Sequence, residues 1–270
     1  MQSYLFWAAT TFYALATALF FIQVSFKKAS FSRYGHLLLF MGAFPHGATL
    51  GLRWVEVGHG PYSTRYEVLA ANALVFLAVY LISTLAAPKI RMLGVLVAPA
   101  VFLLMGMSLG TFELRTEIPI VFRSWWLFLH IAFAKGFGAC SLLAALSAVG
   151  FLIRLKAKNP PGWLPEAPVL DLYAHQYLLV SFLFLGVMIA AGSLWANQAW
   201  GRYWGWDPIE TSALVTWVGF GIILHFRMLH HWGGKRMAWL TLVAFALTVE
   251  TLYLVAIFVP TIHNRYMIGQ

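Results

Sequence analysis

Eight apolar runs constrain this chain more strongly than any other feature of its sequence. A membrane-spanning helix needs about 20 consecutive apolar residues, and prolines, glycines and charged residues fall between these runs, where a continuous helix ends. The pattern predicts an all-α polytopic membrane protein with about eight transmembrane helices, forming a single integral membrane domain over residues 1–270. The runs cover residues 4–26, 35–54, 66–87, 91–109, 125–153, 171–196, 208–228 and 237–259.

The composition excludes the other common classes of protein. Only 10% of the residues are charged, 61% are hydrophobic, and the mean hydropathy is +0.77. A soluble domain carries roughly 25% charged residues, and a disordered chain is far less apolar. The first run has no basic segment before it and no small-residue cleavage site, so we interpret it as a retained helix. The single cysteine, Cys140, lies in an apolar run and excludes dithiol chemistry by this chain alone.

Basic residues are distributed unevenly between the loops of an eight-helix topology. The net charge is +9, which we attribute to basic residues held at one membrane face rather than to nucleic-acid binding. The positive-inside rule assigns the richer face to the cytoplasm, so both termini are predicted on the outer, periplasmic side. The richer face holds Lys27, Lys28, Arg33, Lys89, Arg91, Arg154, Lys156, Lys158, Arg227, Lys235 and Arg236; the other holds Arg53, Arg65, Arg115, Arg123, Arg202 and Arg265.

A tryptophan-rich segment joins the sixth and seventh runs on the predicted outer face. It reads WANQAWGRYWGWD from Trp195 to Asp207 and contains four of the twelve tryptophans of the chain. Two interpretations remain open at this point. The tryptophans form an interfacial aromatic belt, or they form a stacking platform for a large, flat, apolar ligand. Their density within one glycine-containing loop, over residues 195–210, favours the platform.

This segment resembles the WWD signature of haem-handling membrane proteins, and the chain is similar to the CcsA family, the haem lyase subunit of System II cytochrome c biogenesis. Three further segments carry the resemblance: the loop from Arg53 to Glu67, the pair Trp126 and His130, and Leu224–His225–Arg227. The chain departs from the family at Ile209, where lysine is usual, at Ser212, where tryptophan is common, and in its ending, PTIHNRY.

The resemblance implies a function and a set of site residues. The expected function is haem delivery across the membrane and covalent attachment of haem b to a CXXCH apocytochrome c on the outer face, as a subunit of holocytochrome c synthase (haem lyase) that requires a CcsB-type membrane partner. The expected location is the bacterial inner membrane. The implied haem-binding residues are Trp195, Trp200, Gly201, Tyr203, Trp204, Trp206 and Asp207, with His130 and His263 as outer iron ligands. His225 is the implied iron ligand within the membrane, and its second ligand is either His46 or a residue of the partner subunit.

Two other functions fit the same sequence. One is a haem transporter or chaperone without ligation activity, which would use the same aromatic segment and histidines. The other is a structural membrane subunit without haem, in which the tryptophans form only a belt. No side chain is an obvious general base, so we predict no catalytic residue.

The remaining polar residues receive structural interpretations. Asp207 is a natural helix N-cap before Pro208, and Glu210 suits the first helical turn. Lys135 and Glu250 lie within apolar runs. They pair, which is our default prediction, or Lys135 meets a haem propionate. His59 is assigned to a shaped turn. Four other histidines are predicted to be solvated: His36, His175, His230 and His231.

Overall fold

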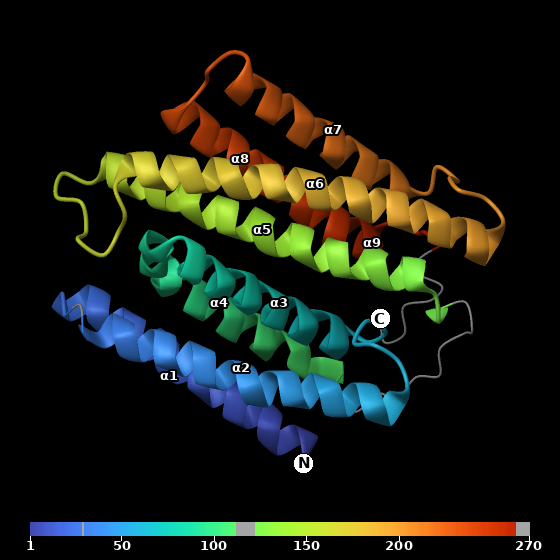
Figure 1. Cartoon of the computed structure of the whole chain (residues 1–270), viewed down its shortest axis with the longest axis horizontal. Helices are drawn as coiled ribbons and strands as arrows, with labels where there is room; N and C mark the ends of the chain where they lie inside the picture. Colours follow the sequence, from blue (N-terminus) through green and yellow to red (C-terminus); the bar gives the residue numbers. More distant parts are fainter. Residues whose placement is uncertain (29, 112–121, 263–270) are drawn as a thin grey trace. The chain divides into compact units, whose positions relative to one another are not determined.

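The computed structural model describes residues 1–28, 30–111 and 122–262, and every regular element among them is helical (Figure 1). The chain is therefore a polytopic all-α membrane protein, as its apolar runs predict. The main helices are α1 (Gln2–Phe26), α2 (Ser30–Val57), α3 (Arg65–Ala86), α4 (Gly94–Met107), α5 (Trp125–Lys156), α6 (Ala167–Trp200), α7 (Pro208–Met228), α8 (Gly234–Val249) and α9 (Val255–Phe258). Short 3₁₀ helices, Pro88–Leu93 and Ser108–Thr111, flank α4, and a π-helical turn, Glu250–Leu254, joins α8 to α9.

Seven helical segments of the described chain are long and apolar enough to cross a membrane: α1, α3, Pro88–Met107, α5, α6, α7 and Gly234–Phe258. The eighth predicted span is α2, whose 28 residues are long enough to cross. It is less apolar than the others because Pro45 and His46 interrupt it. Pro45 lies inside the helix, and His46 is fully buried. The placement of both termini on the outer side requires α2 to cross and stays a prediction.

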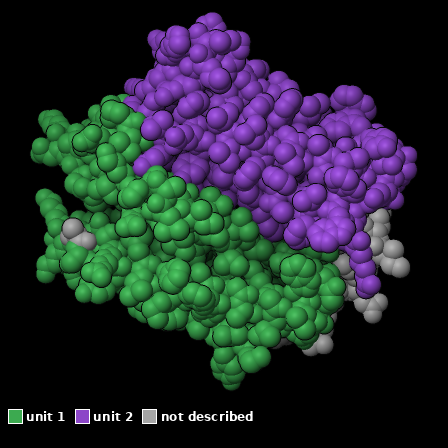
Figure 2. Space-filling view, in the orientation of Figure 1, with its two compact units in different colours: residues 1–117, 153–169, 269–270 green, residues 118–152, 170–268 purple. Residues whose placement is uncertain are grey.

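The chain divides into two compact units, coloured separately in Figure 2. Unit 1 comprises residues 1–117, 153–169 and 269–270, and unit 2 comprises residues 118–152 and 170–268. Helices α1 to α4 belong to unit 1, and α7, α8, α9 and most of α5 and α6 belong to unit 2. That the two units form a single integral membrane domain stays a prediction.

In unit 1, small residues let α1 and α2 approach closely. A Cβ atom on Gly42 would lie 2.6 Å from the ring of Tyr13, so only glycine fits there. The Tyr13 hydroxyl forms a 3.0 Å hydrogen bond with Nδ1 of His46. His36 is not solvated as predicted, because its Nε2 lies 2.8 Å from the hydroxyl of Tyr80 and its ring packs edge-on against Phe20.

The loop between α2 and α3 is organised around one buried carboxylate. Glu67 is fully buried, and its Oε1 accepts a 2.9 Å hydrogen bond from Nε of Arg53. Its Oε2 accepts from the backbone N–H of Ser63, and it forms a capping box with Thr64 at the start of α3. His59 is buried beside this pair and bonds the carbonyl of Gly60, in agreement with its assignment to a shaped turn.

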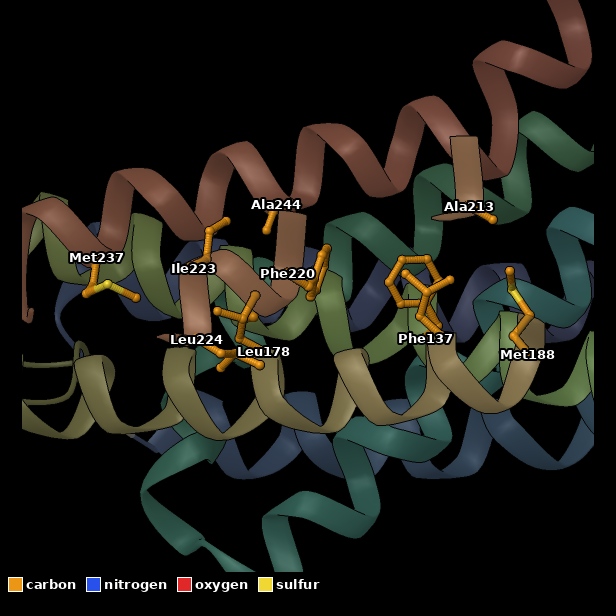
Figure 3. Close-up of a cluster of buried hydrophobic side chains, with 11 residues drawn as sticks. Phe137, Leu178, Met188, Ala213, Phe220, Ile223, Leu224, Met237 and Ala244 are labelled. Atoms are coloured by element: carbon orange, nitrogen blue, oxygen red, sulfur yellow. The ribbon is translucent and has the colours of Figure 1, made fainter. Parts of the chain in front are cut away.

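Unit 2 is held together by a core of apolar side chains from four helices (Figure 3). The core includes Phe137 of α5, Leu178 of α6, Phe220 of α7 and Ala244 of α8. Phe137 and Phe220 meet with ring centroids 5.7 Å apart. This packing fixes the axial positions of α5, α6 and α7, and therefore of the polar side chains that these helices carry at their ends.

Candidate functional site

One open cavity in unit 2 gathers most of the predicted outer site residues. It contains about 430 Å³ of empty space, including its open mouth. The walls come from α5, from residues 188–200 of α6, from the segment that follows α6 and from the first turns of α7. Among the lining residues are His130, Trp195, Trp200, Tyr203, Trp204 and Glu210.

His130, near the start of α5, is held in one orientation by the backbone of α6. Its Nδ1 lies 2.8 Å from the carbonyl oxygen of Met188. A carbonyl only accepts hydrogen bonds, so the neutral ring carries its proton on Nδ1 and its lone pair on Nε2. A histidine that ligates a metal usually donates its other N–H in this way. The geometry therefore presents His130 in the tautomer that a metal ion requires.

The ring of His130 fits against α6 only because residue 192 is glycine. A Cβ atom at Gly192 would lie 2.6 Å from Nδ1 and 2.9 Å from Cε1 of His130. Both Gly192 and Met188 line the cavity. Sequence reasoning missed both residues, because a glycine and a methionine inside an apolar run carry no visible signal of this contact.

The tryptophan rings form walls rather than a flat platform. Trp195 and Trp200 have ring centroids 5.0 Å apart at an interplanar angle of 65°, and Trp204 and Trp206 are 5.8 Å apart at 88°. Edge-to-face pairs of this kind are favourable for aromatic side chains. Trp206 is 71% exposed and does not line the cavity. Three of the four tryptophans therefore share the cavity with His130.

The predicted tryptophan loop is partly helical. Helix α6 continues to Trp200, so Trp195 and Trp200 lie on its last two turns, and only residues 201–207 form the connection to α7. The helix stops where Gly201 adopts a φ of 71°. Trp206 has a φ of 57°, a conformation that a bulky residue adopts only under strain.

Asp207 caps α7, as predicted, and also binds the end of the described chain. Its Oδ2 accepts from the N–H of Ile209, and Glu210 completes a capping box with it. Its Oδ1 accepts a 2.9 Å hydrogen bond from the N–H of Ile262. Glu210 also accepts from the N–H of Gly205 at 2.8 Å. These bonds hold the residues around Trp204 and Trp206 in place from both sides.

The indole N–H of Trp204 is a donor without an acceptor. Its Nε1 is buried and has no hydrogen-bond partner among the described residues. Leaving a buried donor unsatisfied costs about 1–3 kcal/mol, and Trp204 lines the cavity. The cavity thus combines the imidazole of His130, a wall of aromatic rings and the indole N–H of Trp204. The residue types around this cavity therefore suit a flat, apolar metal complex that carries hydrogen-bond acceptors.

The other predicted ligands lie elsewhere. His225 is exposed and lies toward the opposite end of α7 from the cavity. His46 belongs to unit 1, where its Nε2 is buried without a hydrogen-bond partner in the described chain. His263 lies outside the described residues. The structure thus brings His130 together with Trp195, Trp200, Tyr203 and Trp204, but not with His225.

Two predictions about other polar residues were wrong. Lys135 and Glu250 form no ion pair with one another. Glu250 instead accepts hydrogen bonds from the hydroxyls of Ser212, at 2.6 Å, and Thr251, at 3.3 Å. His175 is not a solvated residue, because it is half-buried on α6 and its Nδ1 is fully enclosed. His230 and His231 are exposed, as predicted.

Comparison with known proteins identifies a family. The model of the family described as "Cytochrome C assembly protein" matches residues 62–263. The chain is 35% identical over 204 residues to the "Cytochrome c biogenesis protein CcsA" of Chlamydomonas reinhardtii, covering 72% of this chain and 57% of that protein. It is 30% identical over 271 residues to the protein of the same name from Chlorella vulgaris, covering 83% of each.

A bacterial relative and a solved structure extend the comparison. The CcsA protein of Microcystis aeruginosa is 29% identical over 245 residues, covering 71% of this chain and 74% of that protein. The solved structure of "Cytochrome c Heme Lyase CcmF" matches with a TM-score of 0.70 at 15% identity, covering 93% of this chain and 46% of that chain. At this identity, the similarity to CcmF is one of fold.

Proposed function

Because the chain belongs to the cytochrome c assembly protein family, we propose that it acts in cytochrome c biogenesis as a haem lyase subunit. The cavity beside the tryptophan segment would hold haem b while it is joined to an apocytochrome. The observation that carries this proposal is the set of residues around that cavity: His130 in a ligand tautomer, three tryptophan walls and the unsatisfied indole N–H of Trp204.

His130 is the proposed iron ligand of the outer site, and His263 is its proposed partner. The bond from Nδ1 of His130 to the carbonyl of Met188 supports the first assignment. The family resemblance supports the second. The tryptophan rings would cover the apolar macrocycle and exclude water from it, and Trp204 would donate a hydrogen bond to an acceptor on the haem periphery.

The proposed reaction is addition of two cysteine thiols across two vinyl groups. In each addition a C–S bond forms, the thiol proton goes to the neighbouring vinyl carbon, and the C=C double bond becomes single, with no net transfer of electrons. The thiols belong to the CXXCH motif of the apocytochrome. This chain would contribute by holding the vinyl edge in a fixed position, which is worth several orders of magnitude in rate.

His225 and His46 are proposed as ligands of haem on its way through the membrane. The resemblance of the Leu224–Arg227 segment to the family supports a role for His225. For His46, its complete burial inside a predicted membrane span is the supporting observation. Ionisable residues inside membrane segments are functional candidates by default.

The proposal includes a partner and a location. A CcsB-type membrane subunit would complete the synthase, and the outer face of a bacterial inner membrane would be the site of attachment. Relatives of similar identity occur in organisms as different as Chlamydomonas reinhardtii and Microcystis aeruginosa. The proposed location therefore rests on the uneven distribution of basic residues between the two membrane faces and on the resemblance to the CcsA family.

A covalent reporter tests this function directly. The chain is expressed with its partner subunit and an apocytochrome carrying CXXCH, and haem that stays on the denatured reporter is measured. We expect covalent haem with the parent chain, strong loss with His130→Ala, partial recovery when imidazole is added, and parental levels with His231→Ala.

Each alternative function predicts a different result. Haem bound to the purified chain without any modification of the reporter, even with the partner present, would identify a transporter or chaperone. A chain purified from haem-replete cells without a Soret band would identify a structural subunit, and the tryptophans would then be an interfacial belt.

A further inference from the structure

The turn between α7 and α8 brings two imidazole rings together at the end of α7 remote from the cavity. The ring centroids of His225 and His230 lie 5.5 Å apart, at an interplanar angle of 55°. Both side chains are exposed. His225 is twelve residues beyond Ala213, which lines the cavity, and twelve helical residues correspond to roughly 18 Å. The pair therefore forms a separate location on the molecule.

This turn is braced by several polar contacts. Arg227 donates to the carboxylate of Asp171 on α6 and to the carbonyl of Trp232, the latter at 3.2 Å. Asp171 also accepts from the N–H of Gly234, at 3.1 Å, so it holds both ends of the turn. The rings of Phe226 and Trp232 stack with centroids 4.5 Å apart. His230 is therefore held beside His225 by the fold of the turn itself.

The geometry of the pair limits what it can do with a metal. Imidazole nitrogens bind metal ions at about 2.0–2.1 Å, so two rings 5.5 Å apart can reach one ion. Two axial ligands of haem, however, must face each other across the macrocycle. His225 lies in the last turn of α7 and His230 follows five residues later, with ring centroids only 5.5 Å apart, so the two rings cannot lie on opposite faces of one macrocycle. With an iron porphyrin, only one of them binds the iron at a time.

The surroundings favour an iron porphyrin over a bare cation. Met228 and Leu229, which lie between the two histidines in the sequence, are 61% and 66% exposed and offer apolar surface. Lys235 and Arg236 follow the turn and are exposed, and the guanidinium of Arg236 lies 5.8 Å from the ring centroid of Trp232. The imidazoles can bind the iron, the apolar side chains can contact the macrocycle, and the cationic side chains can pair with the propionates.

We propose that His230 takes up the iron porphyrin at this turn and passes it to His225. In the exchange, the bond from iron to His230 breaks as the bond to His225 forms on the same face, with no change in electron count and no net proton transfer. This inference rests on the proposed function, in which His225 is a haem ligand, and it assigns to His230 a role that the sequence alone did not suggest.

The test measures haem uptake and haem retention separately. The full-length chain is placed in lipid nanodiscs and carries His130→Ala and His263→Ala, so that the outer site contributes neither of its proposed iron ligands. Uptake of added haemin is followed by stopped-flow absorbance, and retention is measured by transfer to excess apomyoglobin. His230→Ala, His225→Ala, the double variant and the neighbouring control His231→Ala are compared. All three histidines are exposed, so these variants should fold, and thermal unfolding checks that they do.

A relay predicts different defects in the two single variants. His230→Ala should slow uptake by about tenfold, the lower end of the 10–100-fold losses seen when a supporting group of a metal site is removed, with unchanged retention. His225→Ala should keep the uptake rate and lose haem to apomyoglobin about tenfold faster. His231→Ala should match the parent. Parental uptake in His230→Ala, identical defects in both single variants, or no uptake by the parent would overturn the relay. A reporter that remains unmodified while uptake depends on His230 would instead refute only the lyase function.

Discussion

Replacing Gly192 by alanine should move the imidazole of His130 without unfolding the protein. The new Cβ atom would lie 2.6 Å from Nδ1, and an ordinary contact is at least 3.4 Å, so the ring must shift by about 0.8 Å. An N–H···O hydrogen bond tolerates donor–acceptor distances from about 2.7 to about 3.2 Å, a span of about 0.5 Å. The shift of the ring is larger than this span. The 2.8 Å bond from Nδ1 to the carbonyl of Met188 therefore breaks.

The expected effect is a loss of haem affinity. Removing the group that orients a metal-ligating histidine costs about 10–100-fold in affinity, or about 1.4–2.8 kcal/mol. Haem titration of the purified Gly192→Ala chain, followed at the Soret band, measures this loss. The fold should survive, because the group that must move is a side chain and because alanine is favoured over glycine inside a helix by up to about 1 kcal/mol.

A matched variant provides the control. Gly221 lies in α7 of the same unit, and a Cβ atom there would meet Phe182 at an ordinary 3.5 Å. Gly221→Ala should bind haem like the parent. If Gly192→Ala folds and binds haem with parental affinity and spectrum, then the orientation of His130 by α6 is irrelevant to the cavity, and the reasoning fails.

Three further tests concern other parts of the structure. Asp207→Ala removes the N-cap of α7 and the hydrogen bond to Ile262. It should lower the free energy of unfolding by about 0.5–2 kcal/mol, which thermal denaturation measures. An unchanged unfolding midpoint would contradict the capping role. Trp204→Phe should weaken haem binding because the indole N–H is lost. Trp206→Phe should not, because Trp206 lies outside the cavity wall. Equal effects of the two substitutions in a haem titration would show that the N–H of Trp204 does not contribute to binding. Glu67→Gln removes the carboxylate charge that buried Arg53 faces and should destabilise unit 1 by about 3–5 kcal/mol, so that the variant accumulates poorly in membranes. Parental accumulation and melting would show that the ion pair contributes little.

The helix pattern was predictable because local signals determine it. Asp207 and Pro208 mark the start of α7, and its structural bounds, residues 208–228, coincide with the seventh apolar run. The end of α6 was less predictable, because nothing between Trp195 and Trp200 interrupts a helix before Gly201. The apolar run stops at residue 196, but helicity does not depend on hydrophobicity once the chain leaves the membrane core.

The contacts between helices could not be predicted in the same way. The hydrogen bond between His36 and Tyr80 joins residues 44 positions apart, and that between Ser212 and Glu250 joins residues 38 positions apart. The register of one helix against another decides such pairs, and helical spacing within a single run does not reveal it. Glu250 also begins a π-helical turn, which changes the face that its side chain occupies.

Some residues of the candidate site could be predicted from the sequence and others could not. The tryptophan segment and His130 could be predicted as site residues from their types and the family resemblance, and the structure places His130 and three of the four tryptophans around one cavity. Gly192 and Met188 could not be assigned, because their contribution is the absence of a Cβ atom and a backbone carbonyl. The proximity of His230 to His225 was equally hidden, since it depends on the conformation of the α7–α8 turn.

The most direct test of the central claim is the absorption spectrum of the haem-loaded chain, reduced with dithionite, for the parent and for His130→Ala. If haem is held in the cavity by His130, the parent should show a Soret band with sharp low-spin α and β bands. The variant should lose or broaden these bands and recover them when imidazole is added. A folded His130→Ala chain with the parental spectrum and the parental haem content would contradict the account.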